Sequence, residues 1–213
     1  MRCTALIFAG LVSLGACAAV ETKNAIDARD DGTNSCKKQN CMDDSQAEKV
    51  ADNFAHLVSA YTKADADAVM APDFLDYSDS VTALINSGCP NGPVPYGAPT
   101  FASRDQFEAG QSSQPNITFT ILSVWHNCDT VILRWRGPLP NPFPNAISPQ
   151  QAVTGLIVIE TTFQGFNCPQ PFLIKTVFSE FNSAAWLYDL SVFVPNCTAD
   201  GFGYPPAGAP AKM

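Results

Sequence analysis

The second half of the chain is dominated by segments rich in β-branched and aromatic residues, each bounded by turn-forming residues. They are NITFTILSVW (116–125), TVILRWR (130–136), AVTGLIVIETTF (152–163), FLIKTVFSEF (172–181) and AWLYDLSVF (185–193). This composition is typical of β-strands. Because the segments follow one another closely, we expect them to pair as an antiparallel meander.

Helical periodicity precedes these strands. Apolar residues recur at intervals of three and four, at Ala47, Val50, Ala51, Phe54, Leu57, Val58 and Tyr61. This spacing predicts an amphipathic helix, and Ser45 with Glu48 predicts a capping box at its start. A short helix is expected at ADADAVM (64–70), ending before Pro72, and another at SRDQFEAGQ (103–111), capped by Ser103 with Phe107 facing inward.

Between these helices, FLDYSD (74–79) is predicted to be the first strand. In a strand Phe74, Asp76 and Ser78 point to one side, whereas Leu75, Tyr77 and Asp79 point to the other. Asp76 and Asp79 therefore cannot both face one metal ion. Helices first and strands afterwards indicate an α+β domain, with helices packed on one curved sheet.

This order of elements, with the stretch ADAVMAPDFLDYSDS (66–80), resembles the nuclear transport factor 2-like superfamily, which includes ketosteroid isomerases, scytalone dehydratase and polyketide cyclases. The closing stretch SEFNSAAWLYDL (179–190) is similar to secreted fungal members of that superfamily. The resemblance covers about residues 41–195. It implies a cone-shaped, curved antiparallel sheet around an internal pocket, wrapped by the N-terminal helices, in a domain spanning residues 41–198.

The resemblance also offers a site. A carboxylate near this strand can serve as general base in catalytic relatives, which makes Asp76 the candidate base and Tyr61 or Tyr77 the candidate donor to an oxyanion. In the structural alternative, Asp76 or Asp79 caps the turn after the strand and Tyr77 belongs to the core. Phe54, Trp135 and Trp186 are candidate ligand-binding residues.

The two histidines do not strengthen the catalytic interpretation. His56 falls on the polar face of the first helix, and His126 lies in WHNCD, which we interpret as a turn. Dehydratase chemistry of the scytalone type would need a pocket histidine beside carboxylate and tyrosine partners. We therefore favour a pocket protein that binds a small apolar ligand or, in the manner of an effector, an extracellular protein. A cofactor-free lyase or isomerase is the alternative, and neither interpretation requires a cofactor.

The N-terminal residues favour export. Arg2, the apolar run Ala5–Leu14 and the small residues Ala16-Cys17-Ala18 form the pattern of a signal peptide, residues 1–18. Polar residues 19–40 are predicted to be a flexible lead-in, and the Gly/Pro/Ala-rich residues 199–213 a disordered tail. Asn116 and Asn196 lie in glycosylation sequons.

Removing the leader leaves six cysteines: Cys36, Cys41, Cys89, Cys128, Cys168 and Cys197. An even number in an exported chain predicts disulfides rather than a zinc site, since no CxxC pair is present. A meander places the WHNCD and GFNCP turns at the same end of the sheet, so we expect Cys128 to pair with Cys168.

Charge and strand patterning bear on partners. Lys and Arg number 12 against 20 Asp and Glu, a net charge of −8, which argues against nucleic acid and membrane surfaces as partners. Arg134 is expected on the outer face, where Glu160 or Glu180 could pair with it. Residues 152–163 are apolar on both faces, which favours a back-to-back homodimer.

Overall fold

A computed structural model describes residues 40–138 and 150–192. The predicted signal peptide, the lead-in, the C-terminal tail, Cys36, Cys197 and Asn196 lie outside the described residues. The helices are α1 (Asp44–Ser59), α2 (Lys63–Val69), α3 (Asp79–Ile85), α4 (Arg104–Ser112) and α5 (Ser183–Asp189). The strands are β1 (Met70–Tyr77), β2 (Thr120–His126), β3 (Thr130–Pro138), β4 (Ala152–Phe163) and β5 (Phe172–Phe181).

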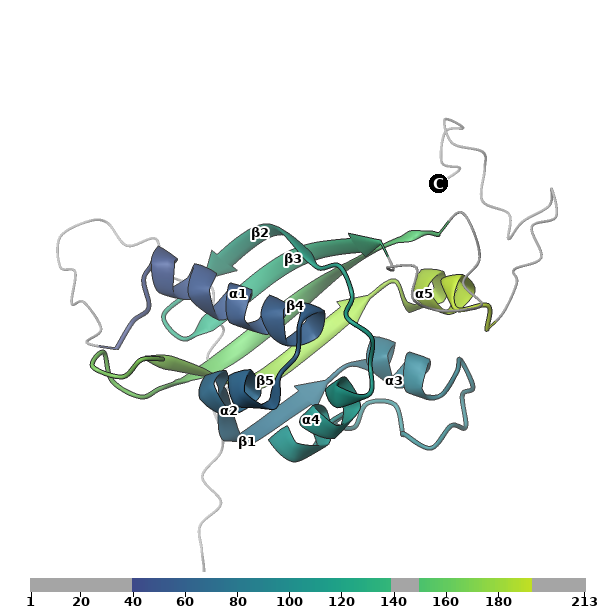
Figure 1. Ribbon diagram of the computed structural model, residues 1–213, viewed down its shortest axis with the longest axis horizontal. Helices are drawn as coiled ribbons and strands as arrows, with labels where there is room; N and C mark the ends of the chain where they lie inside the picture. The colour runs from purple at the N-terminus through teal and green to yellow at the C-terminus, as the bar shows by residue number, and fades with distance from the viewer. Residues whose placement is uncertain (1–39, 139–149, 193–213) are drawn as a thin grey trace, which may run out of the picture. The chain divides into compact units, whose positions relative to one another are not determined.

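The strands form one five-stranded sheet in the order β1-β5-β4-β3-β2. Strands β2 to β5 pair as the predicted antiparallel meander. Strand β1 differs, because it pairs parallel to β5 at the edge of the sheet. The sheet is curved and does not close into a barrel (Figure 1). The α+β prediction, with helices packed on a curved sheet, is confirmed.

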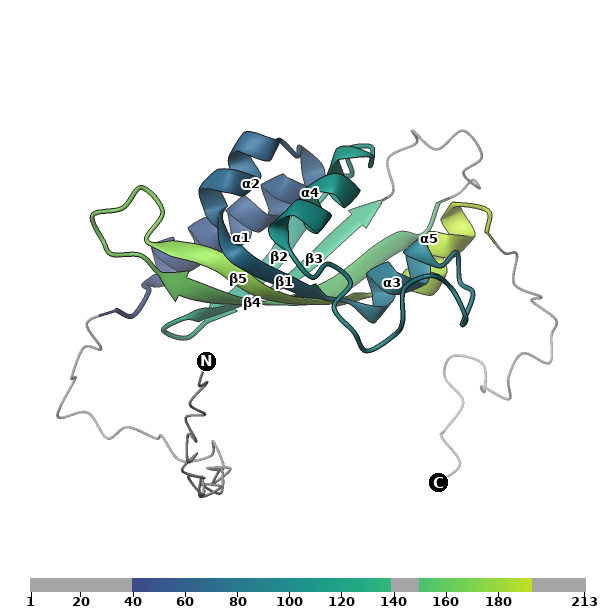
Figure 2. The same cartoon turned by 90° about the horizontal axis from the view of Figure 1, so that it is seen from below.

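Helices α1, α2 and α4 lie on one face of the sheet (Figure 2). The predicted apolar stripe of α1 is buried there, at Ala47, Val50, Ala51, Phe54 and Leu57. Ser103 caps α4 by accepting a hydrogen bond from the Gln106 amide, and Phe107 is buried, both as predicted. No helix among the described residues is long and apolar enough to span a membrane.

Helix α1 begins earlier than its capping prediction. Asp43, not Ser45, is the N-cap: its carboxylate accepts from the Gln46 amide at 2.9 Å, and the Gln46 side chain accepts from the Asp43 amide at 2.9 Å. Asp43 can fill the cap position because its short carboxylate reaches the first free amides of the helix. Ser45 instead donates to Asp43 Oδ1 at 2.8 Å.

The start of α1 is fastened to the turn between β2 and β3. A disulfide joins Cys41 to Cys128, and the Met42 amide donates to the Cys128 carbonyl at 3.0 Å. His126 Nε2 lies 2.8 Å from Asp44 Oδ1, and this hydrogen bond raises the pKa of His126. The expected Cys128–Cys168 pair is therefore wrong. The prediction used only the order of the turns in the meander. It could not anticipate that α1 brings Cys41 to the β2–β3 turn, where Cys128 lies.

The last predicted strand is also wrong. Residues 183–189 form α5, and Asn182 caps it by accepting from the Ala185 amide. The apolar residues Trp186 and Leu187 are adjacent, so they fit a buried strand or a short helix equally well. The cap and the end of β5 at Phe181 decide for the helix, which buries Trp186 and Leu187 against the fold.

The opposite face of the sheet carries large apolar side chains in one cross-strand line. Trp125, Ile132, Val158, Phe178 and Tyr77 are neighbours in register, and we call them the outer row. Trp125 is 51% exposed, and Leu156 beside the row is 52% exposed. Arg134 lies on this face as predicted, but it makes no ion pair with the described residues Glu160 or Glu180.

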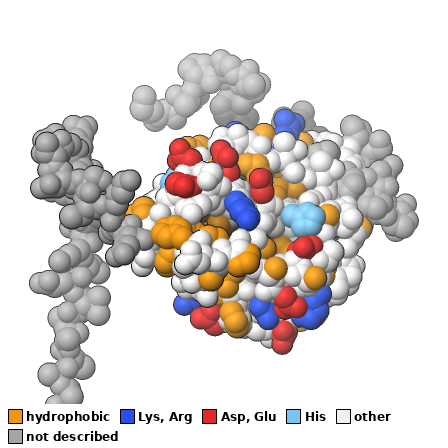
Figure 3. All heavy atoms as spheres, turned by 60° about the vertical axis from the view of Figure 1, so that its left-hand side comes forward, with side chains coloured by type: hydrophobic (Ala, Val, Ile, Leu, Met, Phe, Trp, Pro, Cys, Tyr) orange, Lys and Arg blue, Asp and Glu red, His pale blue; other side chains and the backbone are white. Residues whose placement is uncertain are grey.

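Charges of both signs are mixed on the face that Figure 3 shows, and basic side chains do not gather into one patch there. One group links α2 to α4: Lys63 contacts Asp67 and Glu108, and Arg104 contacts the same two carboxylates. Arg104 also donates to the Met70 carbonyl at 3.2 Å. These contacts hold α4 beside β1.

Candidate functional site

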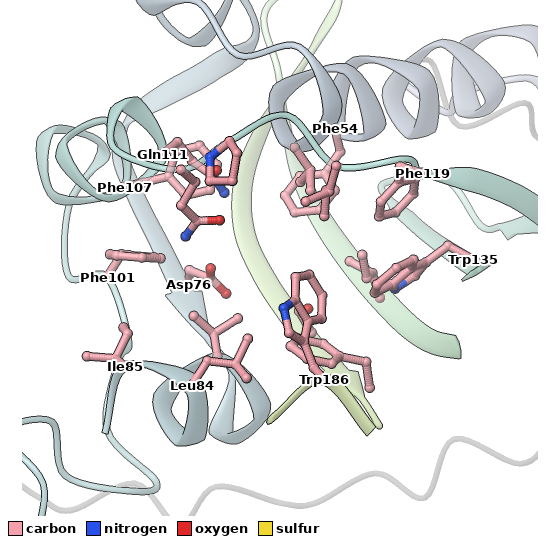
Figure 4. A pocket seen from close by; sticks show the side chains of 18 of the residues that line it. Phe54, Asp76, Leu84, Ile85, Phe101, Phe107, Gln111, Phe119, Trp135 and Trp186 are labelled. Carbon is pink, nitrogen blue, oxygen red and sulfur yellow. The ribbon is translucent and has the colours of Figure 1, made fainter. Parts of the chain in front are cut away.

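A cavity of about 340 Å³ lies between the sheet and the helices. Helices α1, α3, α4 and α5 and the segment before β2 supply its walls, while β1, β3, β4 and β5 supply its floor. Phe54, Trp135 and Trp186, the three predicted ligand-binding residues, all line it (Figure 4). Sequence reasoning missed four further aromatic residues of the lining, Phe101, Phe107, Phe119 and Phe181.

The aromatic wall is built around Trp135 of β3. Its ring stacks on Phe119 with centroids 4.5 Å apart and meets Phe181 and Trp186 edge-on. Gly155 of β4 makes room for it, because a Cβ there would lie 2.7 Å from Trp135 Nε1. The indole N–H of Trp135 is buried without an acceptor.

Asp76 brings the one charged side chain among the described residues that line the cavity. Asp76 faces inward from β1, and only 3% of the residue is exposed. Its backbone pairs with Phe101: the Asp76 amide donates to the Phe101 carbonyl at 2.9 Å. The strand and the 100–101 segment therefore fix where the carboxyl lies.

The Asp76 side chain makes no hydrogen bond or ion pair with any described residue, and its Oδ1 is buried without a partner. Burial raises the pKa of Asp76 to about 7, and the negative charge of Glu180 adds to the shift. The carboxyl therefore exchanges a proton near neutral pH. The alternative in which Asp76 caps the turn is not what the structure shows.

Asp79 holds the neighbouring loop instead. Its carboxylate accepts from the Gly97 amide at 2.8 Å. Ser78 is the residue that caps α3, accepting from the Val81 amide. Asp76 thus lies at the cavity and Asp79 at the loop. The predicted strand 74–79 ends early, at Tyr77, because Ser78 caps α3, so strand alternation is not what separates the two aspartates.

The two candidate tyrosines are not among the residues that line the cavity. Tyr61 follows α1, and burial and the charge of Glu108 raise its pKa. Tyr77 faces outward and stacks on Phe178, with centroids 5.4 Å apart. Neither residue is placed to donate to a molecule bound at Asp76, and the polar groups that share the lining are Gln111, Ser113, Gln114 and Ser179.

Neither histidine lines the cavity. His56 is exposed and lies 3.3 Å from Asp65, while His126 is bound to Asp44 at the end of β2. No group of three or more His, Cys, Asp or Glu side chains in the described part of the chain could hold a metal ion.

The chain is thus an α+β domain in which helices and a curved sheet enclose a cavity with one acidic group. Residues 40–193 match the family model of the NTF2-like domain, and the chain belongs to this family. No curated protein sequence matches the chain.

Several solved structures are similar to the chain at low sequence identity. A protein provisionally named a polyketide cyclase, from Bacillus cereus ATCC 10987, is 10% identical, covers 70% of this chain and 83% of its own, and has a TM-score of 0.49. A provisionally named ketosteroid isomerase from Kribbella flavida is 9% identical, with 79% and 93% covered and a TM-score of 0.44. A provisionally named SnoaL-like polyketide cyclase from Jannaschia is 14% identical, with 69% and 92% covered and a TM-score of 0.42.

Proposed function

We propose that this protein binds a small molecule with an apolar body in the cavity at Asp76. The observation that carries the proposal is a cavity of about 340 Å³ with an aromatic and aliphatic lining and one convergent carboxyl group. Ligand sites are concave and mostly apolar, with few polar groups that fix orientation, and volumes begin at about 300 Å³. A protein partner, as an effector would have, would bind elsewhere, on the exposed outer row.

Native mass spectrometry of protein purified from its natural source tests this proposal. We expect a bound small molecule that is released on denaturation. The substitution Val58→Trp should reduce its occupancy, because Val58 is a half-buried residue of α1 at the cavity wall. Ile132→Trp, on the outer face, is the matched control and should leave occupancy unchanged. A cavity that stays empty in ligand-rich extracts would contradict the proposal.

A cofactor-free lyase or isomerase is the second candidate, and the unpartnered carboxyl of Asp76 is the observation that favours it. A base with a pKa near neutral pH can remove a proton from a carbon acid and return it. Trp186 supplies an indole N–H on the side of Asp76 opposite Phe101 (Figure 4), and Gln111 an amide. These groups replace the predicted tyrosines as donors to a developing oxyanion.

Nitrobenzisoxazole tests for such a base. The base removes the ring C–H proton, the N–O bond breaks, and a coloured cyanophenolate forms. We expect the wild-type protein to accelerate this reaction and Asp76→Asn to lose the acceleration. Equal rates for the two proteins would exclude Asp76 as a base for carbon acids.

We also propose that the protein is exported. The leader-like residues 1–18 and the similarity of residues 179–190 to secreted fungal proteins support this, and a disulfide at Cys41–Cys128 suits an oxidising compartment. The mature chain in culture medium should begin at Ala19 when its N-terminus is sequenced. Retention of the full chain inside the cell would contradict export.

A further inference from the structure

The cavity lacks a counter-charge for its carboxyl group. Asp76 is the charged member of the described lining, and the other polar members, Gln111, Ser113, Gln114 and Ser179, are neutral. None of them hydrogen-bonds to the Asp76 side chain. A buried carboxylate is costly unless a cation or several donors satisfy it. No described side chain supplies such a cation or donor to Asp76, so the ligand would have to supply it.

The walls around Asp76 present aromatic rings. Phe101 is its backbone neighbour, and Phe107 packs edge-on against Phe101 with centroids 5.7 Å apart. Figure 4 shows Phe101 on one side of Asp76 and Trp186 on the other. The electron-rich faces of such rings attract organic cations, and tryptophan does so most strongly. Rings and carboxylate together form a cage for positive charge.

The charged residues around Asp76 also favour a cationic ligand over an anionic one. The elements packed on β1 or lining the cavity bring Glu180 and Lys175 in β5, Asp79 in α3, Arg104, Asp105 and Glu108 in α4, Lys63 in α2, and Asp189 in α5. The cations among them are paired: Arg104 and Lys63 each contact Asp67 and Glu108, and Lys175 contacts Asp73. Glu180 is the group whose charge acts on Asp76, and it is negative. An anionic ligand would meet uncompensated negative charge at the floor.

We propose that the ligand of this cavity is an organic amine that binds as its ammonium ion, with the nitrogen at Asp76 and the apolar body against Phe101, Phe107 and Trp186. The inference rests on the proposed binding function and names the ligand class for that same site. A neutral alcohol could donate one hydrogen bond to Asp76, but it lacks the charge that the carboxylate and the rings select.

Three probes that share a naphthalene ring test the effect of charge at nearly constant shape. They are naphthylmethylamine, naphthylmethanol and naphthoate, each substituted at the same ring position. Their affinities for the full chain would be measured by calorimetry at about pH 8.5, where Asp76 is ionised and the amine is protonated. We expect the amine to bind about tenfold or more tightly than the alcohol, as a charge-assisted hydrogen bond implies. The carboxylate probe should bind most weakly.

Two variants test whether Asp76 causes the preference for the amine over the alcohol. Asp76→Asn should bring the amine to the affinity of the alcohol. Asp73→Asn is the matched control, since it removes an exposed carboxylate of the same strand, which pairs with Lys175, and it should keep the preference. If Asp76→Asn does not fold, the wild-type protein at about pH 5.5 gives the same test, because protonated Asp76 should lose most of the preference.

The outcomes distinguish the two proposals. An alcohol that binds as tightly as the amine, or a preference that survives Asp76→Asn, overturns the amine inference and leaves small-molecule binding intact. Binding by none of the three probes counts against both the cavity as a ligand site and the inference built on it.

Discussion

Burial raises the pKa of Asp76, and the negative charge of Glu180 adds to the shift although the two carboxyl groups lie on opposite faces of the sheet. Asp76 faces the cavity from β1. Glu180 faces outward from β5 and accepts hydrogen bonds from the Asp79 and Ser80 amides at 2.9 and 3.1 Å. Glu180 therefore has two effects. It holds α3 against β5, and its negative charge disfavours the ionised form of Asp76.

Asp76→Asn should stabilise the protein at alkaline pH. The folded-state pKa of Asp76 is raised from 3.8 to about 7, so ionising the carboxyl costs folding free energy as pH rises through that window. The full cost, on the order of 4 kcal/mol, is present above about pH 7 and absent below the unfolded pKa. The asparagine side chain of the variant does not ionise, so the variant does not lose this folding free energy.

Urea unfolding of both proteins at about pH 8 and about pH 4 measures this difference. We expect a higher midpoint for Asp76→Asn at the alkaline pH and similar midpoints in acid. A variant that is less stable than the wild type at both pH values would show that Asp76 has a structural role.

Glu180→Gln should lower the pKa of Asp76 while α3 stays in place. The glutamine oxygen can still accept from one of the two amides, but the negative charge is gone. Burial remains the larger cause, so the pKa should fall part of the way from about 7 toward 3.8. Carboxyl carbon NMR of Asp76 across pH measures the midpoint, with Glu160→Gln, an exposed carboxylate on β4, as the control. An unshifted midpoint in Glu180→Gln would refute the coupling.

Breaking the Cys41–Cys128 disulfide should lower stability more than removing another cysteine. The bond closes a loop with a sequence separation of 87, and such cross-links contribute about 2–4 kcal/mol. Cys41→Ser should lose about that much free energy of unfolding in a urea titration. Cys168→Ser is the control, since Cys168 is free in the structure, and it should lose little. Equal losses would contradict the Cys41–Cys128 assignment.

We propose a homodimer through the outer row, as the apolar faces of residues 152–163 predict. Leu156 and Phe178 are exposed on this face, and exposed apolar patches of this kind mark interaction surfaces. Sedimentation at micromolar concentration should give twice the chain mass, and Leu156→Asp should give the monomer. Phe166→Asp changes an equally exposed apolar residue in the turn after β4 and should remain dimeric. A monomeric mass for the wild-type protein would contradict the homodimer proposal.

Local periodicity was sufficient for the parts of the fold that depend on nearest neighbours. The stripe from Ala47 to Leu57, the Ser103 cap and the alternation of β3 are all found in the structure, because each is fixed by repeat geometry over a few residues. The same alternation predicted that Asp76 and Asp79 point to opposite sides, but Asp79 begins α3, so the helix and not the strand period sets its direction. The alternation could not say which of the two faces a cavity.

Tertiary contacts decided the rest. Residues 185–193 have strand-like composition, yet residues 183–189 form α5, and its packing into the core brings Trp186 to the cavity. Cys128 meets Cys41 because α1 crosses the sheet, a contact that no spacing along the meander encodes.

The sequence by itself determined the α+β class and the antiparallel meander, since these follow from side-chain period and strand order. Only the tertiary structure decided that Tyr61 and Tyr77 lie outside the cavity and that Asp76 is buried within it without a partner. The physical reason is that the pKa and the chemistry of a carboxyl group are set by what surrounds it. Some of those neighbours come from α3, which follows β1 directly, but the others come from α4, α5 and β5, which are distant along the chain.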